Sequence, residues 1–242
     1  MVVKSILLYL QTIFKMKVLV VYIFLLLSFL GAKAQINEIG IFVGGSNYIG
    51  DIGPTDYIAP SEPTLGLLYK WNRSTRHSYR FSIKHGNINA NDKDSDVPGR
   101  NLRGFSFTNS ITEFSAGLEF NFFDFDLHES GTLFTPYVFT GVSHFIYNEK
   151  YILGTKAETD YRDSAFAIPM IVGIKTRFLE NLILGFEVGA RYTFTDNLDG
   201  SNPKNDNFES VRFGNLNSKD WYVFTGFTLT YTFGDNPCFC AE

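Results

Sequence analysis

The chain has 242 residues, of which 45% are hydrophobic, 17% aromatic and 19% charged, and its formal net charge is −4. This length suffices for one domain. The acidic balance excludes nucleic-acid-binding proteins, which present a basic face, and the sequence contains no low-complexity tract and no repeat in the solenoid range.

The N-terminal segment has the pattern of a secretory signal peptide. Residues 18–30 form an almost unbroken apolar run after a basic start, and Ala32-Lys33-Ala34 is an A-x-A cleavage site. The run is shorter than the roughly 20 residues of a spanning helix, and an uncleaved anchor is the alternative. We predict that residues 1–34 are a signal peptide, with Met16 as a second possible start. Its removal takes away four lysines and no acid, so the mature chain from Gln35 has a formal charge of −8.

Eight later stretches alternate apolar and polar residues. The clearest is 111–122, where the even-numbered positions are mostly aromatic or aliphatic and the odd-numbered positions from 113 to 121 are polar, charged or glycine. Successive side chains of a strand point to opposite faces, so such a stretch is a strand with one apolar and one polar face. The eight predicted strands are residues 36–45, 63–71, 79–85, 111–122, 135–147, 168–178, 182–194 and 221–233.

The connections between these strands alternate in length. Long polar segments follow the odd-numbered strands and shorter ones follow the even-numbered strands, which is the asymmetry of outer-membrane barrels. Open edges are not tolerated in lipid, so the sheet must close. We therefore predict an all-β fold: an eight-stranded antiparallel transmembrane β-barrel of the outer-membrane type over residues 35–233. Both termini would be periplasmic and the short turns would face the periplasm. The four long extracellular loops would be residues 46–62, 86–110, 148–165 and 195–220.

Charged residues occupy one parity of the predicted strands. If the aromatic faces meet lipid, these charges face the lumen, where an eight-stranded barrel has room only for side chains. Buried charges must pair, so we predict a structural network; a proton path or substrate channel is the alternative. The predicted lumenal residues are Arg80, Lys84, Glu113, Glu119, Lys175, Arg177, Glu187 and Arg191.

Catalytic and metal-binding motifs are absent from the sequence. Ser143 and His144 are neighbours in a strand and point to opposite faces, so they cannot form a dyad with each other. Asp92, Asp94 and Asp96 suggest calcium but lack the glycine and distant glutamate of an EF-hand loop, which favours a solvated acidic loop. We expect neither enzymatic activity nor a cofactor. A lipid hydrolase with a different Ser–His pair is a minor alternative.

A short tail, residues 234–242, follows the last strand and carries the only two cysteines, Cys238 and Cys240. In an oxidising periplasm one of them could bond to a partner protein. A Cys238–Cys240 bridge would close a strained ring, and a local disulfide or thiols without a role remain alternatives.

Three segments together resemble one family. Residues 37–40 and 44–51 (Asn-Glu-Ile-Gly and Gly-Gly-Ser-Asn-Tyr-Ile-Gly-Asp), the Tyr192–Asp199 segment with its Y-x-x-T-D-x-L-D pattern, and Gly234-Asp235-Asn236-Pro237-Cys238 are similar to PorG-type outer-membrane proteins of the type IX secretion system. The resemblance covers essentially the whole mature chain.

This resemblance implies a non-enzymatic component that anchors the periplasmic ring of the lipoprotein PorK and of PorN to the outer membrane, for protein secretion and gliding motility. Other secretion-system outer-membrane proteins and the membrane lipid would be further partners. Only the periplasmic turns and the tail would face that ring. The alternative is a stand-alone barrel for structure, adhesion or small-molecule passage. The candidate contact residues are Asn236, Pro237, Cys238, Phe239 and Cys240 of the tail, and Asp124, Asp126 and Glu129 of a turn.

Overall fold

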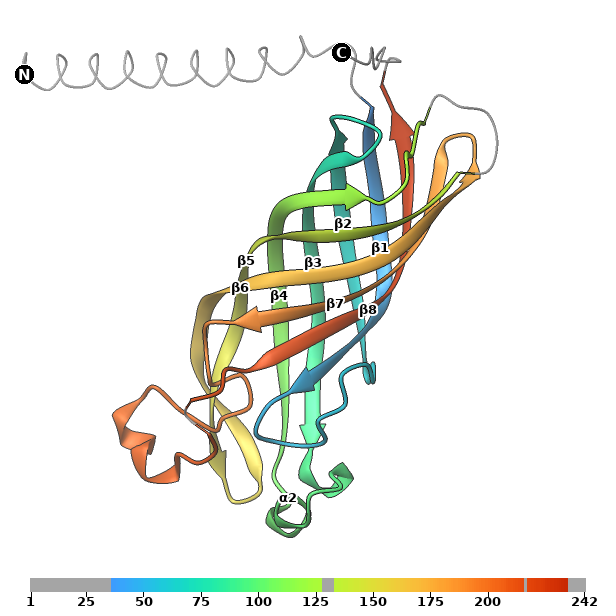
Figure 1. Ribbon diagram of the computed structural model, residues 1–242. Helices are drawn as coiled ribbons and strands as arrows, with labels where there is room; N and C mark the ends of the chain where they lie inside the picture. Colours follow the sequence, from blue (N-terminus) through green and yellow to red (C-terminus); the bar gives the residue numbers. More distant parts are fainter. Residues whose placement is uncertain (1–35, 128–132, 216, 235–242) are drawn as a thin grey trace, which may run out of the picture. The chain divides into compact units, whose positions relative to one another are not determined.

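The computed structural model describes residues 36–127, 133–215 and 217–234, and residues 36–233 form one compact unit. This unit is an all-β, eight-stranded, closed antiparallel barrel (Figure 1) in which each strand pairs with the next and β8 pairs with β1. The predicted signal peptide and the tail from residue 235 onward lie outside the described residues. The strands are β1 (Asn37–Ile49), β2 (Glu62–Asn72), β3 (His77–Asn91), β4 (Ser106–Asn121), β5 (Phe134–Leu153), β6 (Lys156–Leu179), β7 (Leu182–Thr193) and β8 (Trp221–Phe233).

The two ends of the barrel differ. One end carries the connections after β1, β3, β5 and β7, and we call it the loop end; the other carries the remaining connections, and we call it the turn end. Three short helices lie in the loop-end connections: η2 (Asp92–Asp94), α2 (Pro98–Arg103) and η3 (Asp206–Val211). In the described part of the chain, no helix is long and apolar enough to cross a bilayer.

Six strands, β1 to β6, are longer than the sequence predicts, and the largest extensions are in β3 to β6. The strands β3 to β6 extend into the predicted loops 86–110 and 148–165, and the second of these is a hairpin whose turn is only Gly154 and Thr155. The prediction of a long loop there was wrong because strand pairing satisfies backbone hydrogen bonds whether or not the side chains are apolar. The turn needs a left-handed backbone, and Gly154 supplies it with φ 68°.

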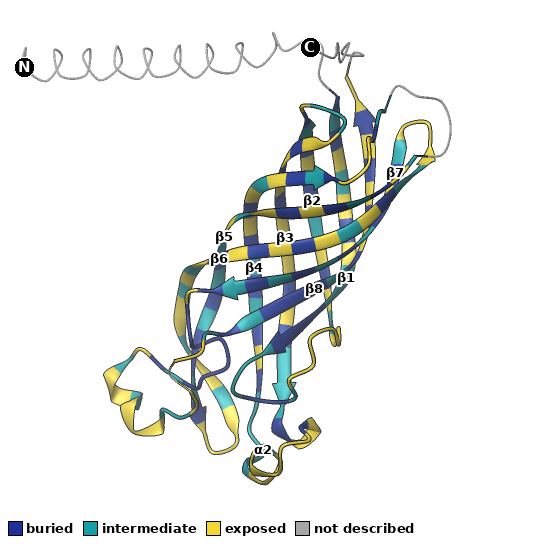
Figure 2. Cartoon of the chain, viewed as in Figure 1, coloured by how far each residue is buried: buried dark blue, intermediate teal, exposed yellow. Residues whose placement is uncertain are grey.

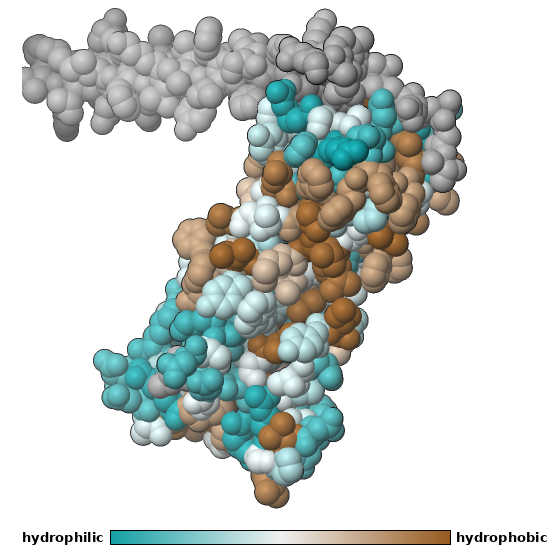
Figure 3. All heavy atoms as spheres, in the orientation of Figure 1, coloured by the Kyte–Doolittle hydropathy of each residue, from teal (hydrophilic) through white to brown (hydrophobic). Residues whose placement is uncertain are grey.

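Burial alternates along the wall of the barrel (Figure 2). On β3, Arg80 and Lys84 are buried, whereas Phe81 and Ile83 are about half exposed. Apolar side chains therefore cover the outside and charged side chains fill the inside, which is the reverse of a soluble barrel. Figure 3 shows the apolar surface across the barrel, with hydrophilic surface at its loop end.

The interior is not exclusively polar. The sequence analysis assigned the aromatic faces to lipid, but several large aromatic side chains also lie inside the barrel, between the charges. Lys84 Nζ lies 4.0 Å from the centre of the Phe42 ring, so these rings also stabilise cations. The most deeply buried of them are Phe42, Tyr137, Phe139, Phe145, Tyr147, Tyr222 and Phe224.

Candidate functional site: the charged interior and the plugged mouth

Seven of the eight predicted lumenal charges meet inside the barrel, and each is at most 3% exposed. They come from β3, β4, β6 and β7, whose alternation directs one parity of each strand inward. Their contacts form three groups along the barrel axis, each centred on a glutamate.

The middle group is centred on Glu187. Its carboxylate accepts hydrogen bonds from Arg80 Nη1 at 2.8 Å and Nη2 at 3.0 Å, from Lys84 Nζ at 2.7 Å and from the Tyr137 hydroxyl at 2.8 Å. Four charge-assisted bonds satisfy this buried anion.

Toward the turn end, Glu119 is the acceptor. Lys70 Nζ and Lys175 Nζ donate to the same oxygen at 2.8 Å and 2.7 Å, and Arg80 Nη1 lies 3.4 Å from the other. Glu38 lies 3.8 Å from Lys70 Nζ and also accepts from Asn72 and Thr230. Sequence reasoning missed Glu38 and Lys70, although each has the inward parity of its strand.

Toward the loop end, Arg191 donates to Glu113 from Nε at 2.8 Å and from Nη2 at 3.2 Å. The Tyr222 hydroxyl donates to the same carboxylate at 2.7 Å. Side chains thus cross the lumen at three levels, and the middle of the barrel is a packed polar core.

Arg177, the eighth predicted residue, lies nearer the turn end than these three groups. It is half-buried near the turn end, where its Nη2 donates to the Asp126 carbonyl at 3.0 Å. The alternation predicted the correct face, but the residue lies beyond the part of β6 that faces the interior ion pairs.

A plug closes the loop end. Residues 195–201, which begin two residues after the end of β7, are all buried even though the sequence is polar. Asn109 Nδ2 donates to the Leu198 carbonyl at 2.8 Å, and Asn197 Nδ2 donates to the Lys150 carbonyl at 2.8 Å. Side-chain amides therefore satisfy one carbonyl of the buried loop and join the loop to the backbone of β5. The sequence analysis placed this segment in a long polar extracellular loop, and the apolar Leu198 within the polar run is the only sequence signal of its burial.

Two buried carboxyl groups hold the plug. The Tyr48 hydroxyl donates to Asp220 at 2.5 Å, and the Leu198 N–H donates to the other Asp220 oxygen at 2.8 Å. Asp199 lies beside the same tyrosine, and within the described residues neither carboxyl has an ion-pair partner. Burial, together with the proximity of the two acids, raises the pKa of Asp220 well above its usual range, and burial raises the pKa of Asp199.

Two further ion-pair groups stabilise the loop end. The first is centred on Asp92. Arg103 donates to Asp92, which also accepts from the backbone N–H groups of Gly53 and Phe105. Burial opposes ionisation here, but the Arg103 and backbone hydrogen bonds hold the pKa of Asp92 below its usual value. Asp92 is thus a buried anchor, not a member of a solvated acidic loop.

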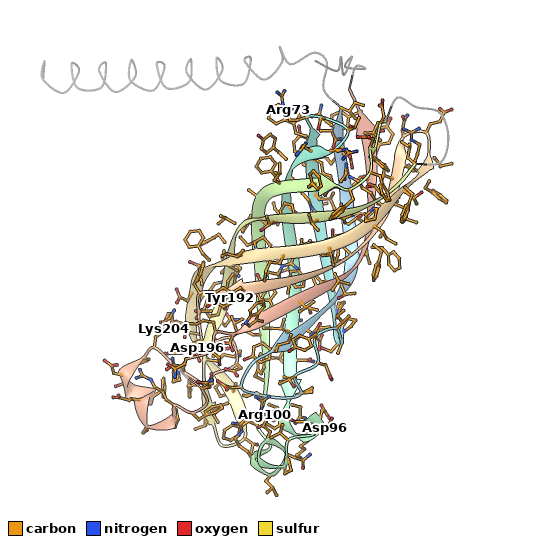
Figure 4. The ribbon with its side chains drawn as sticks, in the orientation of Figure 1. Arg73, Asp96, Arg100, Tyr192, Asp196 and Lys204 are labelled. Atoms are coloured by element: carbon orange, nitrogen blue, oxygen red, sulfur yellow. The ribbon has the colours of Figure 1, made fainter. Side chains whose placement is uncertain are left out.

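The second group ties the β7–β8 connection to the β5–β6 hairpin. Lys204 Nζ lies 2.9 Å from Glu149 and 2.5 Å from Asp163. Figure 4 shows Asp196 and Lys204 on this connection at the loop end, and Arg73 at the opposite end of the barrel.

The predicted turn-end contacts are only partly within the described residues. Arg76 binds Asp124 through Nε at 2.7 Å and Nη2 at 3.0 Å. These bonds lower the pKa of Asp124 to about 2, so its charge is already compensated within the chain. Asp126 supplies the carbonyl bound by Arg177. The remaining candidates, Glu129, Asn236, Pro237, Cys238, Phe239 and Cys240, lie outside the described residues.

The side chains considered for catalysis do not converge. Ser143 is buried inside the barrel, whereas His144 is on the outer wall beside Phe166, with ring centres 5.1 Å apart. In the described segments, no group of three or more His, Cys, Asp or Glu side chains has a metal-binding arrangement.

An apolar exterior, a charged interior and a closed antiparallel wall define a small membrane-spanning β-barrel of the outer-membrane type. The chain belongs to the family described as "Domain of unknown function (DUF6089)", whose model matches residues 17–242. No curated protein matches the sequence.

Several solved structures are similar to the chain at low identity. The attachment invasion locus protein Ail of Yersinia pestis is 11% identical, with a TM-score of 0.46, covering 83% of this chain and 99% of that one. A major outer membrane protein from Thermus thermophilus is 14% identical, with a TM-score of 0.45 and coverage of 83% and 100%. Neisserial surface protein A is 8% identical, with a TM-score of 0.43 and coverage of 82% and 97%.

Proposed function

We propose that this protein is a non-enzymatic outer-membrane barrel whose filled interior rigidly supports a surface platform formed by the loop end. The plug at residues 195–201, buried above the three ion-pair groups, carries this proposal because it leaves the lumen occupied by side chains instead of solvent. The platform consists of the β5–β6 hairpin, α2 and the β7–β8 connection. In this proposal the loop end faces outward and the turn end, where β1 begins and β8 ends, faces the periplasm.

Planar bilayers test the closed interior. The reconstituted wild-type protein is expected to show no stepwise conductance, because water and ions have no continuous route past the ion-pair groups. Reproducible single-channel steps from the folded, heat-modifiable protein would contradict the proposal and favour small-molecule passage.

Loop trimming tests whether the platform serves attachment, which is the adhesion function considered for a stand-alone barrel. Replacing residues 151–158 by a tight turn shortens the β5–β6 hairpin and keeps Glu149 and Lys150, which contact Lys204 and the plug. Cells displaying this variant are expected to lose attachment to surfaces that bind wild-type cells. Equal attachment at equal surface abundance would remove the adhesion role.

A second candidate is the PorK/PorN ring anchor of the type IX secretion system. Two segments that resemble the PorG-type family meet in the structure, since Tyr48 from the first lies beside Asp199 from the second. This contact supports the idea that the loop end of this barrel is built like that of PorG-type proteins. The ring contact itself would be formed by the turn end and the tail, with Cys238 or Cys240 available for a bond to a partner.

Non-reducing pull-downs from native membranes test this anchor. In wild-type membranes we expect a heavier band that collapses on reduction and disappears in the Cys238→Ser or the Cys240→Ser variant. A monomer without the ring lipoprotein in every lane would leave the stand-alone barrel as the function.

A further inference from the structure

The β1–β2 connection folds back over the outside of the barrel. Asn47 has the outward parity of β1, and its Nδ2 donates to the Asp56 carbonyl at 3.0 Å and to the Tyr57 carbonyl at 3.4 Å. Asn47 pairs in register with Val223 of β8. Although Val223 points away from the lumen, only 3% of it is exposed, because neighbouring groups on the outer wall cover it.

Between this connection and the wall lies an apolar groove with a volume of about 500 Å³. This size is within the range of pockets that hold small molecules, roughly 300–1,000 Å³. Its floor is formed by the small outward residues of β6, β7 and β8, and none of its lining residues is charged. The lining residues are Ile49, Tyr57, Ile58, Met170, Val172, Val188, Ala190, Trp221 and Val223.

The groove is continuous with the lipid-facing surface. Met170 and Val172, which form one side of it, are 43% and 59% exposed on the outer wall. Trp221 packs edge-on against Tyr192 with ring centres 5.1 Å apart, and such an aromatic pair near strand ends marks a membrane interface. The side chains of Tyr57 and Ile58 remain 78% and 60% exposed at the other side of the groove.

Asn47 also fixes the position of the connection beside the groove. Its hydrogen bonds to two consecutive carbonyls, those of Asp56 and Tyr57, hold the backbone next to the outer wall. The exposed side chains of Tyr57 and Ile58 therefore border the groove on the side of the connection.

We propose that this groove binds one acyl chain of a membrane lipid and that Tyr57 and Ile58 clamp it against β6, β7 and β8. Recognition is of the hydrocarbon chain, because the lining contains no charged group for a headgroup. The proposal rests on the proposed membrane location, and its test separates failure of the clamp from failure of that location.

The chain has two tryptophans, so Trp71→Phe leaves Trp221 as the only tryptophan reporter, inside the groove. This protein is reconstituted into phosphatidylcholine vesicles with increasing fractions of acyl-brominated phosphatidylcholine. Site-bound lipid is expected to quench Trp221 steeply at low brominated fractions, and Ala190→Phe, which fills the groove, should abolish this steep component. Val138→Phe, on the exposed wall of β5 outside the groove, is the matched control and should retain it.

Each result decides a different point. Steep quenching that is lost in Ala190→Phe and in Tyr57→Ser/Ile58→Ser, but kept in Val138→Phe, supports the clamp. Equal, shallow quenching in all folded variants means that lipid contacts the wall without a site, which overturns the clamp and keeps the membrane location. Absence of quenching in every folded variant overturns both. Native mass spectrometry gives an independent readout, in which the protein with an intact groove retains one phospholipid and Ala190→Phe retains none.

Discussion

At the residue scale, the interior depends on anions that each serve several cations. Glu187 is the strongest case, since it accepts four hydrogen bonds from three side chains. A buried charge that loses its partner is far more costly than an exposed one, so the ion pairs of this barrel differ widely in their contribution to stability.

Glu187→Ala is expected to lower the free energy of unfolding by about 3–5 kcal/mol, because it leaves Arg80 and Lys84 buried with fewer counter-charges. Urea unfolding of the barrel in vesicles measures this loss. Asp124→Ala is the control: it breaks the exposed Arg76–Asp124 pair and should change stability little, because solvent screens such pairs. An equal decrease in the free energy of unfolding in the two variants would contradict the view that the buried ion pairs stabilise the barrel more than the exposed pair does.

The paired carboxyls of the plug predict a pH dependence. Burial raises the pKa values of Asp199 and Asp220 in the folded protein, whereas an unfolded aspartate titrates near 3.9. A raised folded pKa means that the stabilisation is complete below the unfolded pKa and is lost as pH rises through the folded pKa. The plug should therefore loosen as pH rises. Ionisation of Asp199 and Asp220 is unfavourable because the two carboxyl groups are buried and lie near the further acids Asp51 and Asp196.

Hydrogen exchange at the amides of residues 195–201, corrected for the intrinsic effect of pH, measures this loosening. Asp220→Asn keeps a neutral side chain at every pH and should flatten the dependence. An unchanged dependence in Asp220→Asn would assign the titration to another group.

The sequence identifies many interior residues but not their partners. Parity alone located Arg80, Lys84, Glu113, Glu119, Lys175, Glu187 and Arg191, because a strand has only two faces. The sequence analysis missed Glu38 and Lys70 because the inward faces of β1 and β2 also carry the apolar Phe42 and Leu68. The alternation of polar and apolar residues is therefore less regular in these two strands. The pairing of Glu187 with Arg80, 107 positions apart in sequence, depends on barrel closure and is not encoded locally.

At the element scale, strand length is where the sequence is least informative. Outside the membrane one face of a strand meets water and the other meets the plug, so apolar alternation fades although pairing continues. The 24 residues of β6 and the 20 residues of β5 thus form a hairpin that extends well beyond the predicted strand ends. This hairpin is held by η3 and by Lys204, both from the connection after β7.

The contact of the hairpin with η3 predicts a local effect of Tyr151→Ala. Tyr151 stacks on Phe208 with ring centres 3.8 Å apart and planes within 3°, and such a pair contributes about 0.5–1.5 kcal/mol beyond its buried area. Its loss should free η3 without unfolding the barrel, which limited proteolysis would show as faster cleavage near residues 206–211. Leu153→Ala, at an exposed position of the same hairpin, should not change that rate; equally fast cleavage there would assign the effect to the hairpin in general.

At the scale of the whole molecule, closure of the barrel depends on the seam between β1 and β8. Eight strands and their parity follow from the sequence pattern, but the register of the seam joins residues from the two ends of the chain. Gly44 pairs with Gly226 across it. A Cβ on Gly226 would lie 2.5 Å from the Gly44 Cα and 2.8 Å from the Phe42 ring. The two glycines therefore leave room for the Phe42 ring inside the barrel, at the seam between β1 and β8.

Gly226→Val is therefore expected to block closure, because the added side chain meets backbone on β1 that cannot move without breaking the ladder. The readout is heat-modifiable migration in detergent gels, which a closed barrel shows and an open sheet does not. Thr225→Val on the same strand is the control. The buried Thr225 hydroxyl has no hydrogen-bond partner, so removing it should leave closure intact. A fully heat-modifiable Gly226→Val protein would show that the seam tolerates the added side chain. In that case closure would be determined by the interior ion pairs instead of the glycine contact.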